Sequence, residues 1–329
     1  MNDIWDITFL DVGQGDATDI LLPSGSHILI DTGPCVGRGG VSDGNILCEW
    51  FARGMRPVTI KFVIITHNHE DHFGGLITLL QQLNVRIENV IILADSIYNN
   101  ESKASFHELL ELLEERQDIN KIVNPQPVCI YTEQGLKLVL KYPPVELMDK
   151  PPANPNVSSM IVSLEKETAE ASKALVIWCG DAKLSSVQKV CTGLSPSLMM
   201  GPHHGKPQDI KASKNFCTLL KDVNPLRMYL SFGRDNIHQH PCRDYVVGAR
   251  LCGIKLCCSE VAGFCSPNCQ ESVFNGNGML GLNDLPGMMQ CRGSMNLKFS
   301  ASGLHGIDVY ERLFNDAVSK RVPSPHCRK

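Results

Sequence analysis

Short apolar runs separated by turn-forming residues dominate the first third of the chain. Residues 4–12, 17–22, 27–30 and 61–66 have this pattern, and the sequence Pro-Ser-Gly-Ser at 23–26 is expected to join the second and third runs into a hairpin. The run 61–66 (KFVIIT) is compact and rich in β-branched residues, which is typical of a buried strand.

Apolar residues at helical spacing alternate with further strand signals along the rest of the chain. We expect helices at 43–54, 75–83, 105–118 and 209–221. Further strands are expected at 89–93, 127–132, 136–142, 159–164, 174–179, 198–200, 228–232 and 254–258. Two runs of strands with interspersed helices predict a layered α/β architecture.

The character of the sequence changes after residue 258. Gly, Asn and Cys become frequent, and helical periodicity returns only at 307–319. We therefore expect a main domain at 1–258 and a Cys- and Gly-rich C-terminal extension at 259–329 packed on it. The Pro-rich stretch 143–155 is expected to be a surface loop rather than a linker, because strand signals resume directly after it.

The composition favours a folded protein and limits its class. Hydrophobic residues make up 43% of the chain and charged residues 20%, which is enough apolar sequence for a core. The 31 basic and 35 acidic residues give a net charge of −4, which counts against a protein that holds nucleic acid by positive charge alone. A nuclease is not excluded, because metal ions can hold the phosphate.

Neither a signal peptide nor a membrane span is expected. The N-terminus lacks a basic segment followed by an apolar run, and no apolar stretch approaches the ~20 residues of a membrane helix. We therefore expect a cytoplasmic protein without membrane contact. Its 14 cysteines are then expected to be mostly reduced thiols.

The sequence THNHEDH at 66–72 carries the strongest chemical signal. It directly follows an expected buried strand and places three histidines and an aspartate within six positions. Imidazole and carboxylate are ligands that zinc and manganese prefer. His67 and His69 lie two residues apart, so an extended backbone points both the same way, whereas Asp71 and His72 lie where the chain turns toward a helix. The motif predicts a metal site more readily than a polar turn that is rich in histidine by chance.

This motif resembles the HxHxDH signature of the metallo-β-lactamase superfamily. Further motifs resemble those of its ComEC-type branch in the same order along the chain: DVGQGDA at 11–17, HILIDTG at 27–33, NVSSMIV at 156–162, VIWCGDA at 176–182, GPHHG at 201–205 and NIHQHP at 236–241. The resemblance spans roughly residues 5–245. It implies a four-layer αββα sandwich, with 1–258 as the catalytic domain and a dinuclear metal site at the edge of two facing sheets.

The resemblance also implies which residues hold the two ions. The implied ligands are His67, His69, Asp71, His72, Asp181, His203 and His240. The first two would hold one ion, Asp71 and His72 the other, and Asp181 would bridge both. The histidine-rich set favours zinc, and manganese also suits these ligands.

The pair His203 and His204 leaves an alternative open. One of the two would complete the first site while His240 completes the second, and the sequence does not decide which. The other member would contact the substrate phosphate or protonate the leaving group. The residues expected to take part directly in the chemistry are Asp71, His204 and His238.

Residues beside the implied ligands are expected to have supporting roles. Asp31 is expected to orient a ligand histidine, and Asp16 is expected near it, with an ordinary turn carboxylate as the alternative. Asn156 stands where many superfamily members have a ligand histidine and is a candidate for a substrate contact. Lys206 stands where the branch has a serine, and it is a candidate for binding an anionic substrate, with a solvated loop residue as the alternative. His238 replaces a usual tyrosine and is a candidate proton donor or a neutral loop residue.

The cysteines suggest structural roles rather than catalysis. Cys257, Cys258, Cys265 and Cys269 are candidates for a structural zinc site, although buried reduced thiols explain the same cluster. Isolated cysteines such as Cys217 lie in apolar segments and are expected to act as small apolar side chains. No cysteine has the surroundings that would activate a nucleophile.

The resemblance implies a metal-dependent hydrolase that cleaves phosphodiester bonds, most simply a DNA nuclease. A hydroxide bridging two ions would attack phosphorus, and a nearby histidine would protonate the leaving oxygen. The first alternative is a small-molecule phosphoesterase of the cyclic-nucleotide or phosphocholine type, which the acidic balance favours. Hydrolysis of a lactam, lactone or thioester comes next, and a non-enzymatic binding module would be expected to have lost ligands.

Overall fold

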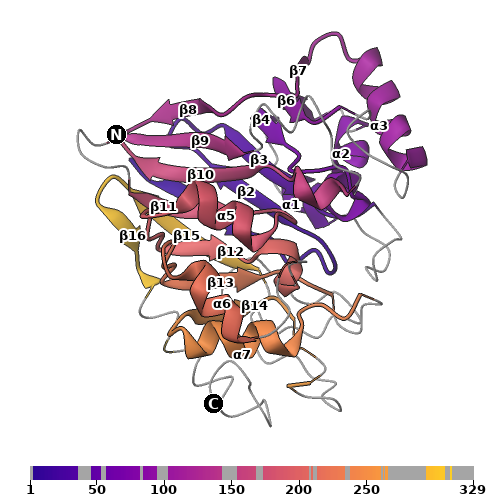
Figure 1. Cartoon of the computed structure of the whole chain (residues 1–329). Coiled ribbons are helices and arrows are strands. Elements are labelled where there is room, and N and C mark those ends of the chain that lie inside the picture. The colour runs from indigo at the N-terminus through magenta and orange to yellow at the C-terminus, as the bar shows by residue number, and fades with distance from the viewer. Residues whose placement is uncertain are drawn as a thin grey trace.

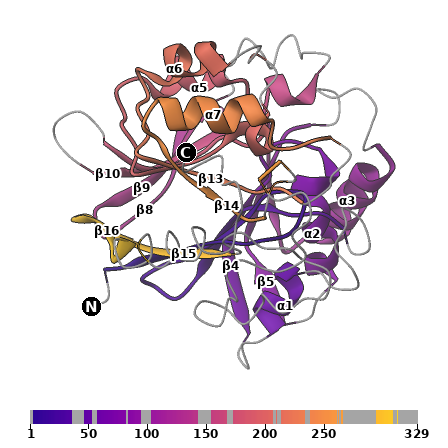
Figure 2. The ribbon, with the colours of Figure 1, turned by 90° about the horizontal axis from the view of Figure 1, so that it is seen from below.

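The computed structural model describes residues 3–35, 46–52, 57–81, 84–94, 103–142, 154–167, 173–206, 209, 213–233, 238–260, 262, 264–265, 294–307 and 312. Two sheets face each other, and helices cover the outer face of each one (Figure 1, Figure 2).

The first sheet has nine strands among the described residues, in the order β16–β15–β1–β2–β3–β4–β6–β7, with β5 beside β4. Their bounds are β1 Trp5–Phe9, β2 Ala17–Leu21, β3 His27–Thr32, β4 Val58–Ile64, β5 Val85–Ile87, β6 Asn89–Ile92, β7 Asn120–Val123, β15 Met295–Ser300 and β16 Gly303–His305. The expected hairpin is confirmed as the antiparallel pair β2–β3, and β3, β4, β6 and β7 run parallel.

The second sheet has seven strands among the described residues, in the order β14–β13–β12–β11–β10–β9–β8. Their bounds are β8 Val128–Glu133, β9 Leu136–Tyr142, β10 Ile161–Lys166, β11 Ala174–Trp178, β12 Leu198–Met200, β13 Arg227–Leu230 and β14 Lys255–Cys258. β8 to β11 pair antiparallel, whereas β11 to β14 pair parallel. Each sheet therefore has a parallel part, and in both sheets the site residues follow strands of that part.

The core lies in three layers between and outside the sheets. Trp5, Phe9, Trp178 and Phe299 are buried between the sheets, where the rings of Phe9 and Trp178 stack 6.3 Å apart. The helices of the first sheet are α1 Ile46–Ala52, α2 Glu70–Leu80 and α3 Lys103–Glu115, and those of the second are α5 Leu184–Cys191, α6 Ser213–Leu220 and α7 Arg243–Leu251. This arrangement confirms the expected four-layer αββα class.

Helix α2 begins five residues earlier than the expected helix at 75–83, at Glu70. Gly74 and Gly75 both lie inside the helix. A Cβ on Gly75 would overlap the carbonyl of Thr32, so the missing side chains let α2 pack directly on the end of β3. Asp71 and His72 consequently project from the first turn of a helix.

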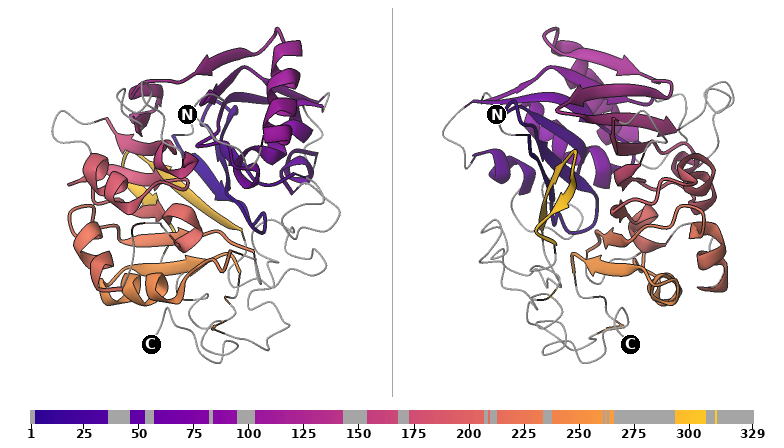
Figure 3. Two further views of the ribbon diagram at one scale, coloured as in Figure 1. Left: turned by 45° about the vertical axis from the view of Figure 1, so that its right-hand side comes forward. Right: turned by 90° about the vertical axis from the view of Figure 1, so that its left-hand side faces the viewer.

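The C-terminal segment supplies two strands of the first sheet. β15 pairs antiparallel with β1, with Trp5 opposite Phe299, and β16 pairs with β15. Figure 3 shows these yellow strands beside the indigo β1. The division at residue 259 stays a prediction, but 295–305 within the expected extension are part of the main sandwich.

One expectation about the cysteines is wrong. Cys217 of α6 forms a disulfide with Cys252, the residue after α7, although it was expected to be a free apolar side chain. The two helices pack side by side, with the rings of Phe216 and Tyr245 4.5 Å apart, and this packing brings together cysteines that are 35 residues apart. The pairing depends on tertiary structure, which the sequence spacing does not reveal.

The predicted structural zinc site is only partly within the described residues. Within the described ranges, Cys257, Cys258 and Cys265 form no disulfide and join no group of converging metal-ligand atoms. Cys269 lies outside the described residues. The zinc site therefore stays a prediction.

Truncating Phe299 tests whether β15 is part of the core. Phe299→Ala is expected to lower the free energy of unfolding by about 3–5 kcal/mol, because the removed ring leaves a cavity between the sheets. The matched control is Lys298→Ala on the opposite face of the same strand, where the side chain is 58% exposed. It is expected to change stability by less than about 0.5 kcal/mol. Equal losses for the two variants in denaturant unfolding would contradict the pairing of β15 with the core.

Candidate metal centre

The predicted site residues follow the carboxyl ends of strands from both sheets. Asp31 lies near the end of β3, and 66–72 follows β4. Asp181 follows β11, and the GPHHG turn follows β12. Ligand sites of α/β sheets commonly form at such strand ends, since the loops there converge.

One oxygen of the Asp181 carboxylate faces three histidines. Its Oδ2 lies 3.5 Å from His67 Nε2, 3.4 Å from His203 Nε2 and 3.8 Å from His69 Nδ1. His67 Nε2 and His69 Nδ1 are themselves 3.0 Å apart. Three imidazole nitrogens thus lie within 3.8 Å of one carboxylate oxygen, which suits the ligands of a single metal ion.

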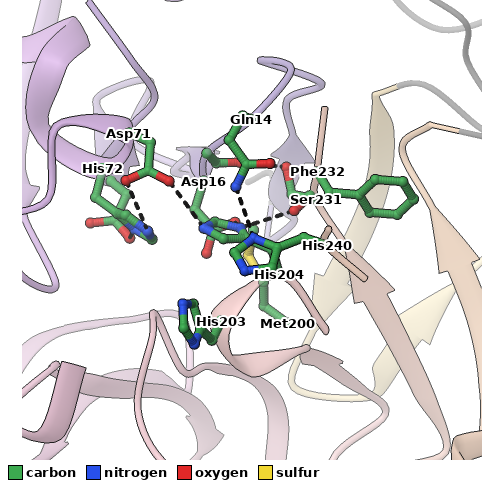
Figure 4. A network of polar contacts seen from close by, with 12 residues as sticks. Gln14, Asp16, Asp71, His72, Met200, His203, His204, Ser231, Phe232 and His240 are labelled. Atoms are coloured by element: carbon green, nitrogen blue, oxygen red, sulfur yellow. Dashed lines mark hydrogen bonds and ion pairs between the residues drawn. The ribbon is translucent and has the colours of Figure 1, made fainter. Parts of the chain in front are cut away.

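The other oxygen of Asp181 faces a second group. Its Oδ1 lies 3.2 Å from His72 Nε2 and 3.6 Å from His204 Nε2. Asp71 closes the group, with Oδ2 3.3 Å from His204 Nε2 and Oδ1 3.9 Å from His72 Nε2 (Figure 4). The two oxygens of a single carboxylate therefore belong to two different sets of ligand atoms.

Buried atoms without hydrogen bonds show that the second group fits a cation. His72 Nε2, His204 Nε2 and Asp181 Oδ1 are buried and make no hydrogen bond within the described residues. Burying polar atoms costs free energy unless a hydrogen-bond partner or a cation binds them. A divalent cation would satisfy all three at once, since imidazole nitrogen and carboxylate oxygen are its ordinary ligands.

Asp31 determines which nitrogen of two histidines faces the centre. Its Oδ2 accepts hydrogen bonds from His72 Nδ1 and from the hydroxyl of Thr66, both at 2.8 Å. Because the Thr66 hydroxyl donates its proton to Asp31, its oxygen is left to accept from His67 Nδ1, 3.2 Å away. With a metal ion bound, both rings would therefore carry their proton on Nδ1 and offer the lone pair of Nε2 to the centre.

The GPHHG turn presents both of its histidines to the site. His203 and His204 have φ values of 51° and 52°, a left-handed backbone that is rare for residues with a side chain. A hydrogen bond from His203 N to Gly180 O (2.9 Å) holds the turn against the loop of Asp181. His204 Nδ1 donates to Ser231 O at 2.9 Å, which leaves the lone pair of Nε2 for the centre. Both histidines reach Asp181, each on a different oxygen.

His240 lies beside this centre rather than between its carboxylates. Its ring is 4.9 Å from that of His203 and 5.3 Å from that of His204. Its Nδ1 is 3.1 Å from the Nε2 of Gln14, a residue that the sequence reasoning did not select. The only signal for Gln14 was its place inside the DVGQGDA motif. The predicted role of His240 as a ligand stays untested.

The other predicted residues lie around the rim. Asn156 is buried, with Nδ2 3.4 Å from His203 Nε2. Lys206 and His238 are exposed, and Lys206 Nζ donates to the carbonyl of His238 at 2.7 Å, which joins the two loops. Asp16 is buried, and its Oδ1 lies 3.3 Å from His204 Nδ1. It therefore contacts the nitrogen of His204 that does not face Asp181.

A divalent cation and a proton compete for the histidines of the site. Burial lowers the pKa of His67 to about 3, so this imidazole is neutral at pH 7. Burial also opposes a charge on His72, but the carboxylates of Asp31, Asp181 and Asp71 outweigh it and raise the pKa of His72 well above its ordinary value. The same carboxylates would attract a divalent cation, whose binding displaces protons from histidine ligands.

Residues 10–145, less than half of the chain, match the family profile of the Metallo-beta-lactamase superfamily. This segment contains the 66–72 motif and most of the first sheet. Together with the two facing sheets, the match decides the fold. The chain has the metallo-β-lactamase fold.

Solved structures with this fold are similar to the chain at low sequence identity. Tm1679, a metal-dependent hydrolase of the β-lactamase superfamily, is 14% identical and has a TM-score of 0.45, with 78% of this chain and 97% of that chain covered. The metallo-β-lactamase-fold protein YhfI from Bacillus subtilis is 12% identical with a TM-score of 0.42, covering 78% and 96%. A diphosphatase from the PhnP family is 13% identical with a TM-score of 0.40, covering 77% and 94%.

No curated protein matches the chain. None of the described helices combines the length and the apolar character that a membrane crossing requires.

Replacing Asp31 by asparagine is expected to weaken metal binding about 10–100-fold, because Asp31 accepts at both oxygens. Oδ2 accepts from His72 and from the Thr66 hydroxyl, and Oδ1 accepts from the Thr66 backbone N–H, whereas asparagine has only one acceptor oxygen. Competition with a fluorescent zinc chelator measures this affinity. The control is Asp19→Asn, since Asp19 is also buried and accepts from a histidine, His27 Nδ1, at 2.8 Å outside the centre. Unchanged affinity in Asp31→Asn would mean that the hydrogen bonds of Asp31 do not orient ligands.

Proposed function

We propose that the protein is a metal-dependent hydrolase that cleaves phosphodiester bonds, with DNA as the first candidate substrate. The observation that carries the proposal is the division of the Asp181 carboxylate between two groups of ligand atoms, three of which are buried without hydrogen bonds. Two divalent ions, when bound, would neutralise a phosphate and lower the pKa of a water molecule.

The residues divide naturally into two ligand sets. His67, His69 and His203 would hold one ion with Asp181 Oδ2. The other ion would be held by Asp71, His72 and His204 with Asp181 Oδ1. This division uses both members of the His203–His204 pair, whereas the sequence resemblance implied only one as a ligand.

The residues at the rim would bind and orient the substrate. Lys206 offers a positive charge, and its bond to the His238 carbonyl fixes the loop that carries His238 and His240. Asn156, buried beside His203, offers an amide to a phosphate oxygen. An anionic substrate would therefore meet donors on one side and the ligand cluster on the other.

A small phosphoester is the second candidate substrate. The net charge of −4 favours it, because grooves that hold a nucleic-acid strand usually carry many positive charges. Phosphodiester chemistry is common to both candidates, so a substrate panel separates them.

The decisive experiment is cleavage by protein that is stripped of metal and reloaded with zinc or manganese. The panel contains labelled single-stranded and double-stranded DNA, a cyclic nucleotide, a chromogenic phosphocholine ester and a chromogenic lactam. We expect cleavage of DNA by the wild type, with a loss of at least about 100-fold in Asp71→Ala and Asp181→Ala.

The control variant for this panel is Asp118→Asn, an exposed carboxylate paired with Arg116 at 2.8 Å away from the centre, which is expected to keep full activity. Cleavage of the small esters alone would move the second candidate to first place. Cleavage of the lactam alone, or none by protein that holds two ions, would overturn the phosphodiester proposal.

Lys206 is expected to contribute to the binding of the anionic substrate. Lys206→Gln should raise KM about 2–5-fold with little change in kcat, because the lost charge is exposed and screened by solvent. Lys121→Gln is the matched control, since Lys121 Nζ likewise donates to a backbone carbonyl, that of Leu113 (2.9 Å), on the outer side of the first sheet. Steady-state kinetics that show the same KM for both variants would remove Lys206 from the substrate site.

A further inference from the structure

Gln14 is a nearly buried amide that contacts two loops of the site. It lies in the β1–β2 loop and is 7% exposed. Its Oε1 accepts a hydrogen bond from the backbone N–H of Gly233 (3.3 Å), and its Nε2 lies 3.1 Å from His240 Nδ1 (Figure 4). A Cβ on Gly233 would come within 2.9 Å of the Gln14 backbone nitrogen, so glycine allows this close approach.

The contact with Gly233 fixes the orientation of the amide. A backbone N–H can only donate, so the Gln14 atom that faces it must be the oxygen. The NH₂ group therefore faces His240, and an NH₂ group can only donate. Nδ1 of His240 must accept this bond, which places the proton of the imidazole on Nε2.

The histidines of the second ligand group have the opposite arrangement. His72 Nδ1 donates to Asp31, and His204 Nδ1 donates to the Ser231 carbonyl. Both rings are left with a lone pair on Nε2, the form that binds a metal. A ring nitrogen that carries a proton has no lone pair to offer, so the Nε2 of His240 is not in the ligand form.

We infer that Gln14 holds His240 as a hydrogen-bond donor to an anionic oxygen of the substrate, and that His204 takes the place in the second metal site that the resemblance implied for His240. The inference rests on the proposed hydrolase function for the identity of the substrate. Gln14 is the positioning residue, and His240 is the residue that touches the substrate.

The position of His240 suits this role. Its ring lies 5.3 Å from that of the ligand candidate His204 and 5.6 Å from that of the exposed His238, so it stands between the centre and the rim. A fixed neutral donor stabilises negative charge that develops in a reaction without giving up its proton. In this role His240 keeps its proton, so it needs no neighbouring acid or base. The amide of Gln14 is neither, which fits the role.

Nitrogen NMR of the histidine rings in the zinc-loaded wild-type protein tests the tautomer directly. We expect His240 to show a proton on Nε2, whereas His72 and His204 show a proton on Nδ1. Gln14→Glu preserves the shape of the side chain but offers only acceptors, so His240 should move its proton to Nδ1. A His240 that carries its proton on Nδ1 in the wild type would overturn the inference without any variant.

The metal content of two histidine variants tests whether His204, rather than His240, is a ligand of the second ion. His240→Ala is expected to keep two ions with unchanged affinity, whereas His204→Ala should weaken the second ion at least about 100-fold. Loss of an ion from His240→Ala would overturn the inference.

Kinetics provide the third measurement. Gln14→Glu should lower kcat about 100-fold, as expected for the loss of one donor to a developing negative charge. The matched control is Gln188→Glu, because Gln188 Nε2 also donates to another side chain, Asp222 Oδ2 (3.2 Å), on the exposed face of α5. The control should change neither the NMR signals nor the rate.

The inference and the proposed function fail in different ways. If no phosphoester is cleaved while His240 keeps its Nε2 proton and His240→Ala keeps both ions, the role of Gln14 stands and the proposed substrate falls. If DNA is cleaved while Gln14→Glu changes neither tautomer nor rate, the proposed function stands and this inference falls.

Discussion

Repulsion between buried carboxylates is the constraint around which the site is arranged. Asp16, Asp31 and Asp181 are each at most 3% exposed and lie within one cluster of histidines. Burying like charges together is costly unless opposite charge or hydrogen bonds compensate. Each of these carboxylates contacts at least one imidazole, and Asp31 also accepts the backbone N–H of Thr66 at 2.7 Å. The remaining negative charge attracts a divalent cation, which competes with a proton on His72.

The backbone around the cluster adopts conformations that few residues tolerate. Gly180, directly before Asp181, has a positive φ, and a Cβ there would overlap the hydroxyls of Ser159 and Thr66. His203 and His204 take a left-handed conformation without being glycine. Such strain persists only where the surrounding structure holds it, and here the rigid sheets hold it from both sides. The unusual backbone conformations are therefore concentrated at the residues that face the metal centre.

The sequence was most informative where the physical signal is local. The β-branched run before residue 66 predicted β4, and the histidine spacing after it placed the ligands at the end of that strand. The start of α2 lies before the expected one, because Gly74 and Gly75 are part of the helix and their lack of side chains lets it pack on the end of β3. Short elements such as β5 and β7 had no distinctive periodicity.

Contacts between distant parts of the chain were out of reach of pattern reasoning. The contact of Gln14 with His240 spans 226 residues, and that of Asp11 N with the hydroxyl of Ser294 spans 283. The tautomer of each histidine depends on such partners, so the sequence could name the histidines but not say which nitrogen faces the metal. The same limit applies to the Cys217–Cys252 disulfide, whose two residues meet only because α6 and α7 pack together.

The pairing of β1 with β15 has a consequence for the order of folding during synthesis. β1 borders a strand that begins at Met295, so the ribosome must produce the whole segment between the two strands before this partner exists. Until then the backbone of β1 has an open edge, and the buried face of Trp5 lacks its cover of Phe299. Open strand edges promote pairing with other chains. The nascent protein therefore exposes an aggregation-prone edge after β1 has emerged, and that edge closes only when β15 and β16 emerge.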